Sequence, residues 1–279
     1  MFLCLNKKGV ANAGKILYYS NIPATKSGLQ TVNYLVRSIW LPMEHAFKCI
    51  QNMAYPGRLI ILGMSPSGET VALYAITGRS PSSQARRLEI TADQKKVVVF
   101  PTDEATLRTG NPDLLVYPAI ICGQGIAISN GTQTETVFQH VASDAYPVDV
   151  LSRALRMWDY EPDEPNFTPR ISGCITCGAA LSIIKRSPQG SSVRYFFEVP
   201  LTRGAGKMIA TYTGAQQQPL PSFSGEPLDV LLPWTTPHAA AQALYEALAP
   251  QPGNPDFRVA TAAVFAGDSI TIHVINRHS

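Results

Sequence analysis

The amino-acid sequence predicts an α+β protein in which antiparallel sheets carry helices on their outer faces. Two observations support this class: runs of strand-forming residues come mostly as hairpins, and segments with helical periodicity are few and clustered. With 279 residues, 45% of them hydrophobic and 15% charged, the chain is long enough to bury a sizeable core. We therefore expect a folded globular protein.

The first half of the chain predicts one helix, two hairpins and two short helices. Apolar residues recur at helical spacing between positions 33 and 50, interrupted at Pro42. Runs of strand-forming residues separated by turn residues then predict strands at 58–64, 71–77, 114–121 and 125–129. Two short helices should follow the second hairpin, one of them marked by apolar residues between 150 and 158.

The second half predicts a meander, a helix and a final hairpin. Three runs rich in strand formers indicate an antiparallel meander between residues 170 and 213, at 171–176 with its continuation, 193–199 and 207–213. The segment 239–248 is a good helix former. The chain closes with predicted strands at 257–265 and 269–275, whereas 216–227 is typical of an exposed loop.

Composition argues against several classes of protein. The net charge of +3 and the lack of a lysine-rich run do not favour nucleic-acid binding. No apolar stretch approaches the roughly 20 residues of a membrane-spanning helix. The first residues lack the basic-then-apolar order of a secretory signal, and five scattered cysteines fit reduced thiols. We therefore expect a cytoplasmic protein without a membrane or nucleic-acid partner; whether it forms a homo-oligomer stays open.

The segment 74–87 is the most informative for chemistry. It carries three serines and three arginines, including Arg79, Ser80 and Arg86, and forked guanidinium groups with hydroxyls bind phosphates and carboxylates. The structural alternative is a solvated loop with a Ser-Pro turn. The residue types place the anion site only slightly ahead of that alternative.

A second candidate is the acidic segment 159–166, which leads directly to Arg170. Asp159 and Glu161 would stay ionised beside a cation and could then accept a proton. A solvated acidic loop is the better interpretation from the residues alone. Tyr117 in an apolar strand and the Asn130-Gly131 turn have structural explanations as well.

Metal and cofactor motifs are weak. Cys174 and Cys177 have the spacing of half a zinc site, but the other cysteines are scattered and the five histidines show no paired metal spacing. The glycine-containing strings at 123–125 and 204–207 lack the full phosphate-loop and dinucleotide patterns and suit hairpin turns better. The sequence therefore predicts neither a metal site nor an organic cofactor.

Five strings in order give the chain a family resemblance: YPGR at 55–58, GRS…R at 78–86, SNGTQT at 129–134, DYEPDEPNFTPRISG at 159–173 and PLPSFSGEP at 219–227. Together they resemble the archaeal-type IMP cyclohydrolase family and its bacterial relatives. The resemblance implies a four-layer αββα sandwich of antiparallel sheets, like the N-terminal-nucleophile hydrolases. It begins near Tyr55, so we expect a domain at 55–279 behind an N-terminal extension, 1–54, that carries a helix.

The resemblance also implies a reaction and site roles. 5-Formamidoimidazole-4-carboxamide ribotide (FAICAR) would close to inosine monophosphate (IMP) with loss of water. Tyr117 matches a family tyrosine and would donate to the formyl oxygen, while Glu161 would be the base, with Asp159 in reserve. The remaining implied contacts are Arg79, Ser80 and Arg86 on the 5′-phosphate or carboxamide oxygen, and Asn130, Gly131 and Arg170 around the base and ribose.

One departure from the family pattern keeps other functions in view. Ala85 stands where the family loop usually carries an asparagine, so one amide donor is missing. A non-catalytic purine-nucleotide-binding or regulatory protein is therefore the second hypothesis. The third is an N-terminal-nucleophile amidohydrolase, which would need a Ser, Thr or Cys freed at a mature N-terminus.

Overall fold

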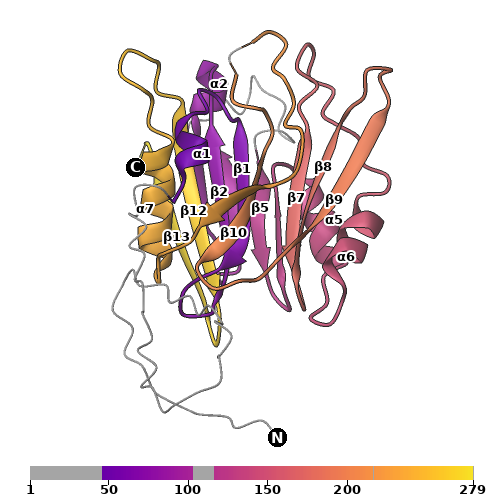
Figure 1. The fold of residues 1–279 in the computed structure, drawn as a ribbon, viewed down its shortest axis with the longest axis vertical. Coiled ribbons are helices and arrows are strands. Elements are labelled where there is room, and N and C mark those ends of the chain that lie inside the picture. Colours follow the sequence, from indigo (N-terminus) through magenta and orange to yellow (C-terminus); the bar gives the residue numbers. More distant parts are fainter. Residues whose placement is uncertain (1–45, 103–115, 216, 279) are drawn as a thin grey trace, which may run out of the picture.

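The structure, a computed structural model, describes residues 46–102, 116–215 and 217–278, and Figure 1 shows their arrangement. The strands of this part of the chain form two antiparallel sheets. The six-stranded sheet contains, in spatial order, β11 (Leu228–Leu231), β10 (Ala205–Ala210), β1 (Arg58–Met64), β2 (Thr70–Thr77), β12 (Arg258–Ala266) and β13 (Ile270–Asn276). The seven-stranded sheet contains β3 (Arg86–Ile90), β4 (Lys96–Pro101), β5 (Tyr117–Cys122), β6 (Ile126–Ser129), β7 (Arg170–Ile175), β8 (Ala179–Arg186) and β9 (Ser192–Val199).

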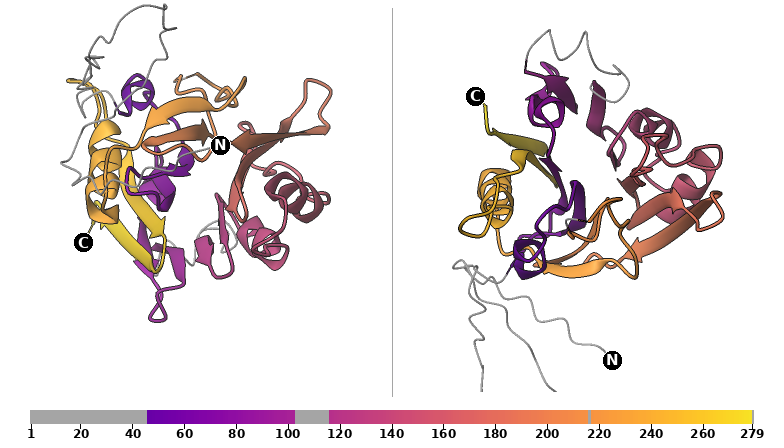
Figure 2. Two further views of the ribbon diagram at one scale, coloured as in Figure 1. Left: turned by 60° about the horizontal axis from the view of Figure 1, so that its bottom comes forward. Right: turned by 90° about the horizontal axis from the view of Figure 1, so that it is seen from above.

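Three helices cover the outer faces of the two sheets, as Figure 2 shows: α5 (Gln133–Gln139), α6 (Pro147–Ala154) and α7 (Pro237–Ala247). Two single-turn helices complete the described part of the chain: α1 (Lys48–Gln51), which contacts α7, and α2 (Pro81–Gln84), in the connection between β2 and β3. Helix α7 packs on β12 and β13, while α5 and α6 pack on the middle and the β9 side of the seven-stranded sheet. No described helix is long and apolar enough to cross a membrane.

The main core lies between the sheets and beneath α7. Residues from both sheets belong to one cluster of buried apolar side chains, among them Leu62 of β1, Leu73 of β2 and Ile171 of β7. Strands β1 and β2 are buried on both faces, which explains why their sequences are continuous apolar runs instead of alternating ones. A smaller cluster lies under α5 and α6.

The α+β class, the antiparallel sheets and the hairpins at β1–β2, β5–β6 and β12–β13 are confirmed. So are the two short helices α5 and α6 and the helix α7. Most of the helix expected at 33–50 lies outside the described residues; α1 is the part that the structure describes. Phe47 beside it stacks on Trp234 with ring centroids 4.9 Å apart, so this end of the predicted extension packs on the core.

Three details of the sequence interpretation were wrong. The solvated loop that was the structural alternative for the segment 74–87 does not extend to its end, because Arg86 and Arg87 begin β3, which pairs with β4. Two adjacent arginines made the start of this strand look like a solvated loop. The meander comprises β7, β8 and β9 only, because β10 pairs with β1 in the other sheet. The short strand β11 was not expected.

Candidate functional site

Four polar side chains meet between the sheets because of strand register. On β1 and β2, Ile60 lies opposite Tyr74, so Arg58, two residues before Ile60, shares a face with Tyr74. On the other sheet, Val99 lies opposite both Leu88 and Tyr117, so Arg86 and Tyr117 share a face. Both faces point into the core between the sheets. Two arginines and two tyrosines therefore occupy one buried region.

Arg58 is held in place by the turn before it. Gly57 has a φ of +76°, and a Cβ there would lie 2.0 Å from Thr211 Oγ1, so glycine is required for both reasons. The Arg58 N–H donates to the same Thr211 Oγ1 at 3.1 Å. This geometry explains the Tyr-Pro-Gly-Arg string physically. Sequence reasoning quoted the string but did not select Arg58 as a site residue.

Arg86 is buried and Arg58 is half-buried, and the guanidinium groups of both are only partly satisfied. The Nε of Arg58 and the Nε and Nη1 of Arg86 have no hydrogen-bond partner among the described residues. Burial and the nearby Arg58 charge lower the pKa of Arg86. For Arg58, burial disfavours the charged form, but the nearby Tyr117, Tyr74 and Glu161 groups favour it more strongly. The pKa of Arg58 is therefore raised. Such donors are arranged to receive an anion.

The two tyrosines form a hydrogen-bonded pair. Tyr74 and Tyr117 are 0% and 2% exposed, and their hydroxyl oxygens are 3.0 Å apart. Burial, then the neighbouring Tyr117, raises the pKa of Tyr74 well above its usual value, which leaves Tyr74 protonated at neutral pH. When Tyr74 donates to Tyr117, the Tyr117 hydroxyl is free to donate onward.

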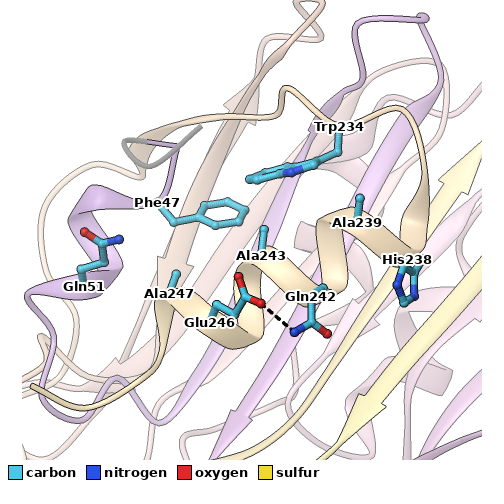
Figure 3. A pocket seen from close by; sticks show the side chains of 9 residues that line it. All are labelled: Phe47, Gln51, Trp234, His238, Ala239, Gln242, Ala243, Glu246 and Ala247. Carbon is cyan, nitrogen blue, oxygen red and sulfur yellow. Dashed lines mark hydrogen bonds between the residues drawn. The ribbon is translucent and has the colours of Figure 1, made fainter. Parts of the chain in front are cut away.

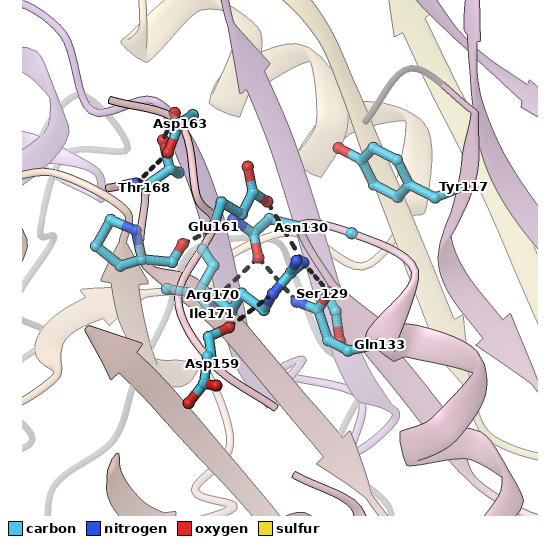
Figure 4. Close-up of polar contacts among 12 residues, drawn as sticks. Tyr117, Ser129, Asn130, Gln133, Asp159, Glu161, Asp163, Thr168, Arg170 and Ile171 are labelled. Atoms are coloured by element: carbon cyan, nitrogen blue, oxygen red, sulfur yellow. Dashed lines mark hydrogen bonds and ion pairs between the residues drawn. The ribbon is translucent and has the colours of Figure 1, made fainter. Parts of the chain in front are cut away.

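Glu161 lies on the segment between α6 and β7, where its charge also acts on Arg58 and Arg86, and Figure 4 shows its carboxylate beside Arg170. Its carboxylate is buried and lies 3.5 Å from Arg170 Nη1, while its N–H donates to Thr168 O at 2.9 Å. Burial raises the pKa of Glu161, and Arg58 and Arg170 oppose that shift. Asp163 stiffens the segment by accepting from the N–H and hydroxyl of Thr168.

Asn130 and Gly131 support Arg170. The Asn130 amide donates to Pro169 O and accepts from Ile171 N–H, each at 2.9 Å, so it ties the turn after β6 to the start of β7. Arg170 donates to Gln133 Oε1 at 3.0 Å. A Cβ at Gly131 would lie 2.9 Å from Arg170 Nη1, so the glycine leaves room for the guanidinium. These contacts fix Arg170 beside Glu161 (Figure 4).

The other predicted site residues lie toward the surface. Arg79 stacks over the Tyr55 ring at 4.8 Å, and Tyr55 in turn contributes to the raised pKa of Arg58, so Arg79 borders the buried region. The Ser80 hydroxyl caps α2 by accepting from Ser83 N–H. The Asp159 carboxylate is 73% exposed and pairs with Arg194, whereas its carbonyl accepts from Arg170. The structure therefore separates the Asp159 carboxylate from Glu161.

Two surface pockets lie outside the buried region between the sheets. One, of about 580 Å³, lies against α7 beside Phe47 and Trp234 and is shown in Figure 3; its lining is mainly apolar. The other, of about 520 Å³, lies outside the segment 157–162 and has Trp158 and Arg170 in its wall. Arg170 therefore lies between this second pocket and Glu161.

The described residues contain no group of three or more His, Cys, Asp or Glu side chains placed to hold a metal ion. The fold does pair two histidines that are distant in the sequence, since His238 Nδ1 and His273 Nε2 are 2.8 Å apart. Sequence spacing could not reveal this pair, because one residue is on α7 and the other on β13.

Comparison with known proteins identifies relatives. The family model described as IMP cyclohydrolase-like protein matches residues 55–267. The chain is 34% identical to the IMP cyclohydrolase of Haloquadratum walsbyi over 137 residues, which are 47% of this chain and 62% of the relative, less than two thirds. It is 30% identical to the Methanopyrus kandleri enzyme over 57% of this chain and 75% of the relative. The Methanothrix thermoacetophila enzyme is also 30% identical, over 60% of this chain and 78% of the relative.

Proposed function

The chain belongs to the family of IMP cyclohydrolase-like proteins, and from this membership we propose that it is an IMP cyclohydrolase. In the proposed reaction the carboxamide nitrogen of FAICAR attacks the formyl carbon, a C–N bond forms, and the formyl oxygen leaves as water. In enzyme classification this is a hydrolase acting on a cyclic amidine. The buried meeting of Arg58, Arg86 and Tyr117 between the sheets is the observation that carries the proposal.

Orientation is the first contribution of the site. An amide nitrogen is a poor nucleophile, and holding it against the formyl carbon supplies roughly 7 to 11 kcal/mol. Negative charge gathers on the formyl oxygen during attack. The unsatisfied guanidinium nitrogens of Arg58 and Arg86 are preorganised donors for that charge in a region shielded from water.

Tyr117 is the proposed proton donor to the departing oxygen. Its hydroxyl can accept from Tyr74 and donate to the substrate at the same time, because the two hydroxyls are in hydrogen-bond contact. Tyr74 then stabilises the negative charge that Tyr117 acquires as its proton leaves. Tyr74 is therefore a positioning residue in this mechanism.

Glu161 is the proposed base for the attacking nitrogen. Burial raises its pKa toward the range in which a carboxylate accepts protons efficiently at neutral pH. Arg170 at 3.5 Å keeps an ionised population available and orients the carboxylate. We propose a supporting part for Asp159 in place of the reserve base: its carbonyl accepts from Arg170 and helps to orient that guanidinium, while its carboxylate is exposed and pairs with Arg194.

The rest of the substrate extends from the buried region toward the rim. We assign the 5′-phosphate to Arg79, with Ser80 beside it, because Arg79 stacks on Tyr55 at the border of the buried region and Ser80 is exposed. Arg170, supported by Asn130 and Gly131, would border the base and ribose. The chemistry needs no metal or organic cofactor.

The family also guides three broader proposals. The order of layers, α7, two sheets, then α5 and α6, supports the four-layer architecture of the N-terminal-nucleophile hydrolases. The family match starting at residue 55 supports a catalytic domain at 55–279 behind an extension at 1–54. Buried free thiols at Cys122 and Cys174 support a reducing, cytoplasmic setting.

The test is an assay of the purified, EDTA-treated full chain with FAICAR, in which IMP is followed by chromatography against an enzyme-free blank. We expect accelerated IMP formation. Tyr117→Phe and Glu161→Gln should each lower kcat by about 10²- to 10⁴-fold with a much smaller change in KM. The matched controls Tyr245→Phe and Glu246→Gln on α7 should retain wild-type kcat. Tight IMP binding without turnover would instead select the regulatory hypothesis.

A further inference from the structure

The two edges of the seven-stranded sheet differ. At the β3 edge, the Asn276 side chain of β13 accepts from Leu88 N–H at 2.8 Å and donates to Leu88 O at 3.0 Å. This amide occupies backbone groups of the edge strand and joins the two sheets. At the other edge, β9 pairs with β8, and no described residue makes a backbone hydrogen bond on its outer side. Within the described part of the chain, the β3 edge is therefore partly closed by Asn276, whereas the β9 edge is unpaired.

Strand β9 has few of the features that protect an edge strand. Its eight residues, SVRYFFEV, contain no glycine, proline or lysine, and they pair with β8 in register without a bulge. Tyr195 is 45% exposed and stacks on Phe197 with ring centroids 6.4 Å apart. A regular, aromatic edge of this length is a template for pairing with another strand.

The sequence of β9 is complementary to itself. A two-fold axis perpendicular to a sheet keeps each side chain on its own face, so a residue can face only partners of the same parity. With the axis at Phe196, Arg194 lies opposite Glu198 and Tyr195 lies opposite Phe197. Both the opposite charges and the aromatic rings then form favourable cross-strand pairs. With the axis at Tyr195, Arg194 would instead face Phe196.

We propose that β9 is a homodimer interface, at which the β9 strands of two copies pair antiparallel about Phe196 and join the two seven-stranded sheets. Arg194 is positioned for this contact, because its guanidinium is held by Leu155 O and Trp158 O, 3.4 Å from the exposed Asp159 carboxylate, and its side chain stays 28% exposed. Glu198 is exposed and can therefore reach the Arg194 side chain of a second copy. The interface is independent of the proposed reaction.

Sedimentation velocity of the full chain over a concentration series tests the interface. Wild type should be a dimer. Glu198→Arg places like charges opposite Arg194, and Tyr195→Lys places a charge in the aromatic pair, so each should raise the dimer Kd by about tenfold or more. The controls are Glu246→Arg on α7 and Ile270→Lys on β13, which replace exposed residues on or beside the other sheet and should leave the Kd unchanged.

Thermal unfolding shows whether each variant remains folded. The interface is supported if both β9 variants are folded monomers while both control variants remain dimers. A monomeric wild type would overturn it, whether the edge is solvated or covered by residues 1–45 of the same chain. Dimers that survive both β9 substitutions would place the contact elsewhere and also overturn it.

Discussion

Arg86 shows at the scale of one residue how a binding site opposes stability. Its side chain is 7% exposed, yet two of its nitrogens lack a partner among the described residues. Leaving a buried donor unsatisfied costs about 1 to 3 kcal/mol, and a buried positive charge beside Arg58 adds repulsion. The free protein carries this cost, and an anionic ligand would relieve it.

Arg86→Met should therefore raise the free energy of unfolding by about 1 kcal/mol or more, measured by urea denaturation. The same change should lower kcat/KM for FAICAR by roughly 10- to 150-fold, because charge-assisted hydrogen bonds to the substrate are lost. Phosphate added to the buffer should raise the Tm of wild type more than that of the variant.

The control for this substitution is Arg87→Met, since Arg87 is 40% exposed and pairs with Glu89 at the surface. It should change unfolding by less than about 0.5 kcal/mol and leave kcat/KM unaffected. An Arg86→Met protein that loses stability without losing activity would show that Arg86 is a structural residue.

At the scale of elements, the turn into β1 determines where Arg58 points. Gly57→Ala would strain a backbone with φ of +76° and force a Cβ against Thr211 Oγ1. We expect a loss of roughly 1 to 3 kcal/mol in the free energy of unfolding and a fall in kcat, because the strand end that carries Arg58 must shift.

Gly253→Ala separates these two effects. Gly253 also has a positive φ, +86°, but a Cβ there would meet nothing within 4 Å. The Gly253→Ala variant should therefore show the cost of the backbone strain without a steric clash. We expect a smaller loss in the free energy of unfolding and an unchanged kcat. Equal effects of the two substitutions on kcat would contradict a role for the Gly57 turn in positioning Arg58.

At the scale of the whole molecule, burial of Glu161 makes stability depend on pH. Its pKa in the folded protein is raised above the usual 4.5, so the folded state holds this proton more tightly than the unfolded state. The unfolded chain then binds fewer protons in that interval, and the free energy of unfolding falls as pH rises from about 4.5 to the raised pKa. Above both the unfolded-state and the folded-state pKa, the contribution of Glu161 to the free energy of unfolding no longer changes with pH.

Glu161→Gln removes this titration. Relative to wild type, the variant should gain stability as pH rises from 4 toward neutrality, and the two proteins should converge at the acidic end. Chemical denaturation at a series of pH values measures the difference. A difference that stays constant across this range would mean that Glu161 titrates normally in the folded protein.

The sequence by itself determined the local elements and the residue types of the site. Continuous apolar runs identified β1 and β2, glycine and turn residues identified three hairpins, and five ordered strings, one of which contains Glu161 and Arg170, indicated the family. These signals are local because periodicity, turn chemistry and short motifs each depend on neighbouring residues.

Tertiary structure alone decided which of these residues meet. Arg58 and Tyr74 come together with Arg86 and Tyr117 because two sheets face each other in a particular register. Sheet pairing likewise places β10 beside β1 and not in the meander of β7, β8 and β9. The carboxylates of Asp159 and Glu161, two residues apart, point to different surroundings. Sheet pairing and burial join residues far apart in the chain, and spacing along the sequence carries no information about such contacts.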